Sequence, residues 1–113
     1  MIETLDQLLA LLTTMSQTYE RAKKEGDFDF FEVVQPFAEK VDQTLDQFKT
    51  FNKEVVRLPY MNQTKFDLLI ENMKALSVEC HFQRTSRKLF TEKLKATHYD
   101  LNLSLIHISE PTR

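Results

Sequence analysis

The chain has few of the residues that interrupt helices. Its 113 residues include one glycine and three prolines, both well below the usual share in a globular protein. Glycine frees the backbone for tight turns and proline removes a helix donor, so their scarcity favours long helices joined by short connections. The sequence therefore predicts an all-helical domain.

The features of secretion, of a membrane span and of a phosphate-binding loop are also missing. The one cysteine, Cys80, cannot form an internal disulfide, which favours a reducing compartment. No apolar run approaches the roughly 20 residues of a membrane helix, and residues 1–12 lack the basic start of a signal peptide. With Gly26 as the only glycine, a glycine-rich P-loop is excluded. A cytoplasmic protein is expected.

Charge of neither sign dominates. Fifteen basic and seventeen acidic residues give a net charge of −2, which exerts no overall attraction toward nucleic acid or anionic lipid. The distribution is uneven, because residues 1–56 hold eleven acidic and six basic residues, whereas residues 57–102 hold five and eight. We expect this asymmetry to help the two halves pair rather than to attract a partner.

Apolar residues are plentiful, at 42% with nine phenylalanines, and they recur at three- and four-residue spacing in four stretches. This spacing places one apolar stripe on one face of a helix. The predicted helices are 2–25, 30–56, a third over 63–82 with an Asn62 or Thr64 cap, and a fourth that begins after a Thr85 or Ser86 cap. Four amphipathic helices with short connections predict an up-and-down antiparallel four-helix bundle.

The densest apolar stretch, Asp29–Phe37, contains Pro36 within its predicted helix. Proline removes a backbone donor and crowds the preceding turn, so the sequence predicts a kink near 32–36 or a short opening turn before a restarted helix. Asp27 or Asp29 can accept the unpaired N–H groups at this helix start.

Several phenylalanines lie within this region: Phe28, Phe30, Phe31 and Phe37. On a helix they cannot all share one face, so most are expected in the core and one or two at the surface. An exposed aromatic ring beside acidic residues is a candidate docking site for a partner protein.

The final residues, Leu103–Arg113, read L-S-L-I-H-I-S-E-P-T-R. This segment resembles the in-frame translation of a transposase-type sequencing-library adapter. We therefore predict a native domain of residues 1–102 and a non-native tail of residues 103–113, and the tail is left out of the fold and function arguments. Its leucines and isoleucines could nevertheless continue the stripe of the fourth helix.

Residues suited to catalysis or metal binding are sparse. No Glu-x-x-His pair occurs, and Glu79 and His81 are two residues apart, so they point to different helix faces. Cys80 lies on the predicted apolar stripe and is expected to be a small buried side chain. A nucleophilic pair of Cys80 with His98 would need the third and fourth helices to align, and no third orienting group is evident. No metal or cofactor is predicted.

A basic strip at the start of the fourth predicted helix could contact phosphate. Glu92 interrupts it and no aromatic ladder accompanies it, so nucleic-acid binding is disfavoured and a solvated helix face is expected. The strip consists of Arg84, Arg87, Lys88, Lys93 and Lys95.

Short motifs along the chain carry a family resemblance. They are D-F-F-E-V-V-Q-P-F at 29–37, P-Y at 59–60, E-N-M at 71–73, S-V-E-C-H-F at 77–82, K-L-F at 88–90 and H-Y-D-L at 98–101. In this order and spacing the chain resembles the YppE-like family, small helical proteins of Gram-positive bacteria of the Bacillus and Listeria type, classed as a domain of unknown function. The resemblance implies a cytoplasmic helical bundle and no established activity. The chain departs from that pattern at Phe48, where tryptophan is common, and at Cys80.

Two functional hypotheses follow. The first is a non-enzymatic module that binds a protein partner, with Phe28, Phe31 and Tyr60 as candidate docking residues. The alternative is an enzyme or ligand-binding bundle with an inter-helix pocket near Tyr60, Glu71 and His98. A polar pocket that contains two of the last three residues would favour the second, whereas a solid core with exposed Phe28 or Phe31 would favour the first.

Overall fold

The computed structural model describes residues 1–109, and every regular element in this part of the chain is helical. The elements are α1 (Ile2–Glu25), the π-helical turn η1 (Phe30–Val34), α2 (Gln35–Lys49), α3 (Asn52–Val56), α4 (Gln63–Glu79) and α5 (Arg87–Ser109). The predicted all-helical class is confirmed. None of these helices combines the length and apolarity that crossing a membrane requires.

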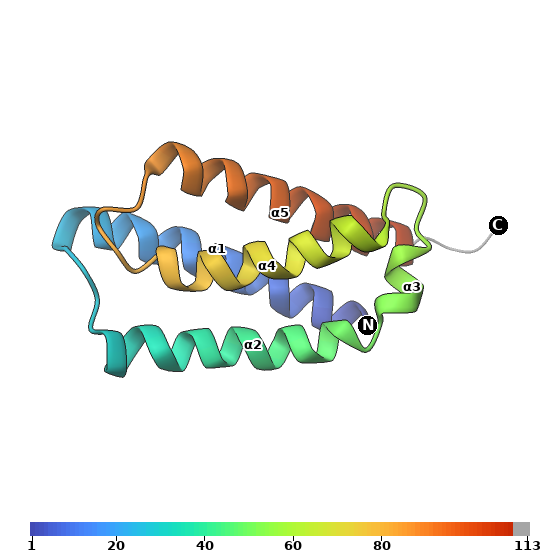
Figure 1. The fold of residues 1–113 in the computed structure, drawn as a ribbon, viewed down its shortest axis with the longest axis horizontal. Helices are drawn as coiled ribbons and strands as arrows, with labels where there is room; N and C mark the ends of the chain where they lie inside the picture. The colour runs from blue at the N-terminus through green and yellow to red at the C-terminus, as the bar shows by residue number, and fades with distance from the viewer. Residues whose placement is uncertain (110–113) are drawn as a thin grey trace.

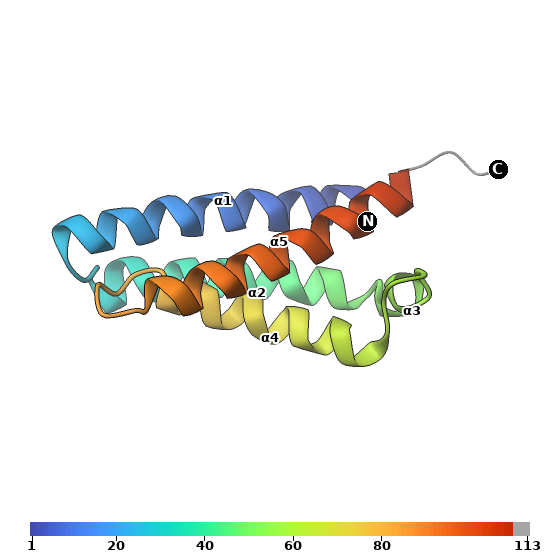
Figure 2. The same cartoon turned by 90° about the horizontal axis from the view of Figure 1, so that it is seen from above.

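The four long helices lie along the length of a molecule that measures 50 × 25 × 23 Å. Figure 1 and Figure 2 show that α1, α2, α4 and α5 run in alternating directions, with the short α3 turned across one end. Packing joins α1 to α2, α2 to α4, α4 to α5 and α5 back to α1. Each long helix thus has two long neighbours, and the core lies between all four.

The core is built from the stripes that the sequence spacing predicts. On α1 the buried positions repeat every three or four residues, as a single apolar helix face requires. Phe48 of α2 stacks on Phe66 of α4, with ring centroids 5.0 Å apart. The other large, fully buried side chains are Leu5, Leu8, Leu12, Met15, Tyr19, Leu45, Leu69, Met73, Leu76 and Leu101.

The chain enters α2 through η1, directly before Pro36. The backbone N–H of Val34 donates to the Asp29 carbonyl and that of Gln35 donates to the Phe30 carbonyl, which is the wide i→i−5 register. Pro36 then occupies the first turn of α2, where its missing donor costs least. Of the two outcomes predicted for this stretch, the structure has the separate opening turn.

The second predicted helix, 30–56, is wrong as a single element, because it is divided at Thr50–Phe51 into α2 and α3. The Thr50 hydroxyl donates to the Gln47 carbonyl at 2.6 Å, a local bond that competes with continuation of the helix. A reciprocal amide pair between Asn52 and Gln63, at 2.9 and 3.0 Å, then links α3 to the start of α4. The apolar stripe continues through the break because Val55 is still buried.

The predicted caps of the third and fourth helices are largely confirmed. The Asn62 side chain accepts from the Lys65 N–H at 2.8 Å and begins α4, and the Ser86 hydroxyl accepts from the Leu89 N–H at 3.3 Å at the start of α5. α4 ends at Glu79 rather than near Phe82. The Thr85 hydroxyl donates to the Glu79 carbonyl at 2.7 Å, so the loop itself caps this helix end.

Residues 103–109 of the predicted tail continue α5 without a break. Ser104 is fully buried, and Leu105 and Ile108 pack against the core. The Tyr60 hydroxyl hydrogen-bonds the Ser104 hydroxyl and donates to the Asp100 carbonyl at 3.1 Å. Residues 103–109 therefore belong to the folded helix. The adapter origin of the segment stays a prediction. Residues 110–113 of the tail lie outside the described residues.

Candidate functional site

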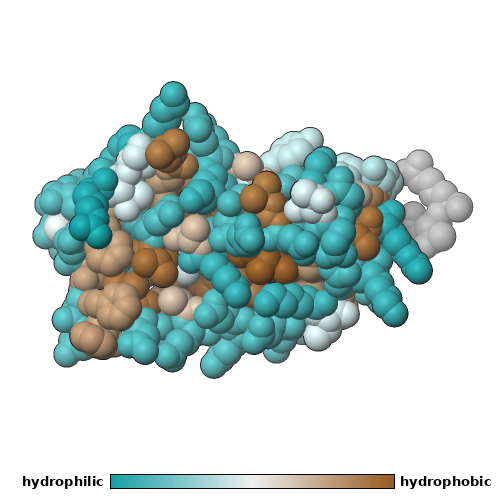
Figure 3. Space-filling model, viewed as in Figure 1, coloured by the Kyte–Doolittle hydropathy of each residue, from teal (hydrophilic) through white to brown (hydrophobic). Residues whose placement is uncertain are grey.

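The most exposed aromatic surface lies on η1. Phe31 is 76% exposed, Phe30 49% and Val33 37%; these three residues are called the η1 patch. The two phenylalanine rings meet edge to face, with centroids 5.3 Å apart. In Figure 3, apolar side chains gather at the end of the molecule where the chain enters α2. Exposed aromatic groups of this size are a mark of binding surfaces.

The connection that leads into η1 is held against the turn after α4. The backbone N–H of Phe28 donates to the His81 carbonyl at 3.0 Å, and the Gln83 N–H donates to the Asp27 carboxylate at 2.8 Å. The Asp29 carboxylate accepts from the Glu32 N–H at 2.7 Å and caps η1, as the sequence predicts. The η1 patch is therefore presented from an anchored backbone.

A second set of contacts ties the end of α1 to the same turn. The Tyr19 hydroxyl donates to the Thr85 carbonyl at 2.9 Å, and its ring stacks on Phe90 with centroids 4.2 Å apart. Arg87 pairs with Glu20 through two contacts of 2.8 and 3.2 Å. Together with the connection at Asp27 and Phe28, these contacts make this end of the bundle one packed unit.

Phe28, predicted as a docking residue, is only partly buried but is already engaged. Its ring lies edge-on to His81, with centroids 5.5 Å apart, and the Arg21 guanidinium lies 5.3 Å from its centroid. The structure therefore separates Phe28, which anchors the connection, from Phe31, which faces solvent. The sequence reasoning did not select Phe30 and Val33, because only the π register of η1 decides which side chains point outward.

Tyr60, the third predicted docking residue, lies at the opposite end of the bundle, in the connection between α3 and α4 (Figure 1). Its ring stacks on His107 of α5, with centroids 5.5 Å apart, and its hydroxyl is bonded to α5. The structure does not bring Tyr60 together with Phe28 or Phe31. Tyr60 closes the end of the core instead.

The acidic residues around the η1 patch have no nearby basic residues in the sequence. Between Gly26 and Glu39 the chain carries Asp27, Asp29, Glu32 and Glu39 and neither lysine nor arginine. Asp27 and Asp29 use carboxylate oxygens to cap backbone N–H groups. Both carboxylates keep their charge, and Glu32 lies between Phe31 and Val33 in the sequence, so the segment that bears the patch is acidic.

His81, rather than His98, is the histidine beside Cys80. The Cys80 sulfur and His81 Nδ1 are 3.4 Å apart, and His81 is packed edge-on between the rings of Phe28 and Phe37. Burial lowers the pKa of the His81 imidazole and raises the pKa of the Cys80 thiol to about 12. The predicted burial of Cys80 is confirmed, and an exposed His98 cannot activate it. This pair is part of the core.

We expect the Cys80 thiol of the folded protein to resist iodoacetamide at pH 8. A pKa near 12 rather than 9 lowers the thiolate fraction about 1,000-fold, and burial adds a steric barrier. Mass spectrometry of alkylated protein with and without denaturant measures the two rates. Equal rates of labelling in folded and unfolded protein would contradict the burial of the Cys80 thiol.

Glu71 and His98 lie in different surface hollows. Glu71 lines a hollow with Lys49, Asn52, Phe66, Asp67 and Ile70, between α2 and α4. His98 lines a groove of about 500 Å³ between α1 and α5. Neither hollow includes Tyr60, so they do not supply the single pocket that the alternative hypothesis requires.

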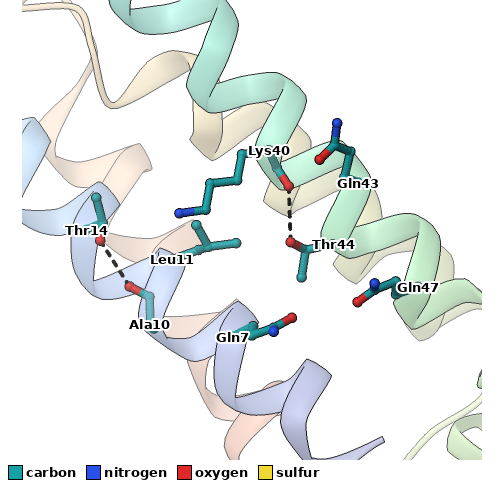
Figure 4. A pocket seen from close by; sticks show the side chains of 8 residues that line it. All are labelled: Gln7, Ala10, Leu11, Thr14, Lys40, Gln43, Thr44 and Gln47. Carbon is teal, nitrogen blue, oxygen red and sulfur yellow. Dashed lines mark hydrogen bonds between the residues drawn. The ribbon is translucent and has the colours of Figure 1, made fainter.

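A further groove, between α1 and α2, is lined mostly by polar side chains, together with Ala10 and Leu11. Figure 4 shows Lys40 extending from α2 toward α1, with amide side chains from both helices around it. The hydroxyls of Thr14 and Thr44 donate to the carbonyls of Ala10 and Lys40 in their own helices, at 3.2 and 3.1 Å. Because these protons are used internally, the groove offers few free donors apart from the amides and Lys40.

A family model for a bacterial domain of unknown function, DUF1798, matches residues 5–108, nearly the whole chain. The chain belongs to this family. The YppE-like resemblance that the motifs carry is thereby confirmed, since a crystal structure of YppE from Bacillus subtilis is among the similar structures. No curated protein matches the chain.

Three solved structures share this fold. A DUF1798 domain from Staphylococcus aureus is 43% identical, with a TM-score of 0.91 over 93% of this chain and 92% of its own. YppE of Bacillus subtilis is 17% identical, with a TM-score of 0.85 over 96% and 95%. A Listeria innocua protein of unknown function is 22% identical, with a TM-score of 0.83 over 94% and 88%. The last two likenesses concern the fold alone.

Membership of DUF1798 assigns no activity, so any site must be argued from this chain's own side chains. Within residues 1–109, no three His, Cys, Asp or Glu side chains are grouped as a metal site would require. The features that remain are the η1 patch and the two grooves beside α1. Of these, the η1 patch exposes the largest apolar side chains.

Proposed function

We propose that this protein is a non-enzymatic interaction module that binds a basic amphipathic segment of a partner protein on the η1 patch. The observation that carries the proposal is the exposure of Phe30 and Phe31 side by side on an anchored turn. In this proposal the four long helices act as an up-and-down bundle that supports the patch, in the cytoplasm.

The apolar side chains of the patch supply the attraction. Burying a phenylalanine that was exposed contributes roughly 1.5–3 kcal/mol, and aromatic residues are common binding hot spots. Val33 lies beside the two rings in the same turn and extends the apolar surface. A partner that covers Phe31 alone would gain much of the available burial.

Charge selects the partner. The four acidic residues of positions 27–39 and the absence of any basic residue there in the sequence favour lysine or arginine on the partner. An amphipathic helix with leucines on one face and lysines on its flanks meets both requirements. Rim charges of this kind act mainly on the association rate and are screened by salt.

Anchoring makes the patch ready to bind. Phe28 and Asp27 fix the connection to the turn after α4, and Asp29 caps η1. A backbone that is already ordered loses less conformational entropy on association than a mobile loop. The partner segment would bear most of the ordering cost.

The test is a fluorescence-anisotropy titration of a labelled amphipathic helical peptide of leucine and lysine. We expect Phe31→Ser to weaken binding at least about 10-fold. Leu89→Ser is the matched control, because Leu89 is 64% exposed on α5, and it should bind like the wild type. Both variants should unfold within about 0.5 kcal/mol of the wild type, since both sites are at the surface.

Two further arms decide the outcome. A peptide in which glutamate replaces lysine should bind much less tightly, and raising the salt concentration should weaken binding of the lysine peptide. Equal affinity of the wild type and Phe31→Ser, or a preference for the glutamate peptide, would overturn the proposal.

A further inference from the structure

The groove between α1 and α5 combines an apolar floor with a polar rim. Figure 2 shows the two helices side by side, and they pack directly on one another. Leu12 is almost fully buried and Leu94 partly so, while Tyr99 is 65% exposed at the edge. The polar lining consists of Thr13, Ser16, Gln17, Lys95, His98 and Asn102.

The rim carries the positive charge of Lys95 and no negative charge. Lys95 and His98 come from successive turns of α5, and no aspartate or glutamate lines the groove. In the part of the chain that the structure describes, neither side chain forms an ion pair within 4.0 Å. Two other cations of α5 are engaged, since Arg87 pairs with Glu20 and Lys93 with Glu79. Lys95 is the lysine of α5 that lines the groove, and it is exposed.

We propose that this groove binds a small amphipathic anion, a carboxylate or sulfonate joined to a flat apolar body. Lys95 pairs with the anion, the Tyr99 ring stacks on the flat body, and the leucine floor covers its far side. Ser16, Gln17 and Asn102 offer hydrogen bonds at the rim. The site is independent of the η1 patch and of the function proposed for it.

Size and lining favour this ligand class over others. A volume of about 500 Å³ falls in the range of roughly 300–1,000 Å³ that small-molecule sites occupy. One lysine and one histidine are too few for the phosphate contacts that bind nucleic acid. The α1–α2 groove contains Ala10 and Leu11 but no aromatic side chain on which a flat body could stack.

The probe is 8-anilinonaphthalene-1-sulfonate, whose fluorescence rises on transfer to an apolar site, titrated into the full chain. We expect saturable binding that Lys95→Gln weakens about 2- to 5-fold and Tyr99→Ala about 5- to 10-fold. Lys88→Gln is the matched control, because Lys88 is an exposed lysine of the same helix outside the groove. It should bind the probe like the wild type.

A neutral analogue, N-phenyl-1-naphthylamine, isolates the charge. The wild type should bind the sulfonate more tightly than the neutral analogue. The ratio of these two affinities should be smaller in Lys95→Gln. Phe31→Ser tests the competing location, since the η1 patch could also take up an aromatic dye. The groove assignment would be overturned if Phe31→Ser lost binding of the probe while Lys95→Gln kept it. It would also be overturned if neither Lys95→Gln nor Tyr99→Ala changed the affinity for the probe. Neither result would affect the peptide experiment on the η1 patch. Circular dichroism confirms that each variant is folded.

Discussion

Replacing Phe48 with alanine is expected to lower the free energy of unfolding by about 3–5 kcal/mol. For a domain of this size, that loss corresponds to a fall in melting temperature of roughly 12–20 °C. Phe48 is fully buried and stacks on Phe66 with centroids 5.0 Å apart. No other substitution considered for this chain removes as much buried aromatic surface.

The expected loss has two sources. Alanine gives up the transfer free energy of the ring, and the surrounding helices can only partly close the cavity that remains. Phe48 is the penultimate residue of α2 and stacks on Phe66 of α4. Its removal therefore weakens the interface between these two helices at the point where the chain turns into α3.

Urea denaturation followed by circular dichroism measures the difference. Phe31→Ala is the matched control, because it removes the same ring from a position that is 76% exposed and should cost less than about 0.5 kcal/mol. If Phe48→Ala and Phe31→Ala were equally stable, the placement of Phe48 in the core would be wrong.

Ending the chain after Asn102 is expected to cost about 2–4 kcal/mol. The deletion removes the last two turns of α5, including buried Ser104 and the packed side chains of Leu105 and Ile108. Tyr60 would lose its ring contact with His107 and its bond to Ser104. Leu101, fully buried, would then lie in a fraying terminal turn.

Thermal denaturation of three chains measures this effect. A chain that ends after Ser109 keeps all of the described α5 and is the control, and Ser104→Ala in the full chain isolates the contact with Tyr60. We expect the chain ending at Asn102 to melt roughly 8–16 °C below the control. If the two melting temperatures differed by less than about one degree, residues 103–109 would contribute nothing to the stability of the bundle. That result would be expected of a foreign segment that does not pack on the core.

Local sequence signals accounted for most element boundaries. The stripe of α1, the Asn62 cap and the Asp29 cap act over a few residues, so pattern and composition were sufficient to predict them. The break at Thr50 was missed because the apolar stripe continues through it and the competing bond is a single side-chain contact. Residues 103–109 were left out of the fold argument because they resemble adapter sequence. That likeness says nothing about packing, and their apolar residues do continue the stripe of α5.

The candidate sites depended on long-range contacts and were harder to predict. Phe28, Phe31 and Tyr60 looked equivalent as aromatic residues in or near connections. In the structure Phe28 packs on His81, Tyr60 is hydrogen-bonded to α5, and Phe31 is exposed to solvent. Spacing within a helix cannot show which side chains of a neighbouring helix meet it. For the same reason, Glu71 and His98 could be named as polar residues but not placed in separate hollows.

The sequence by itself determined that this protein is helical, because few glycines and prolines and a repeated apolar spacing leave no other way to bury its 42% of apolar residues. The order and spacing of short motifs along the chain also indicated the family, which the family model confirms. Only the tertiary structure decided that Phe30 and Phe31 face solvent, since the π register of η1 depends on anchoring contacts far away in the sequence. It likewise decided that α1 and α5 form a groove, because a groove exists only where two helices pack side by side.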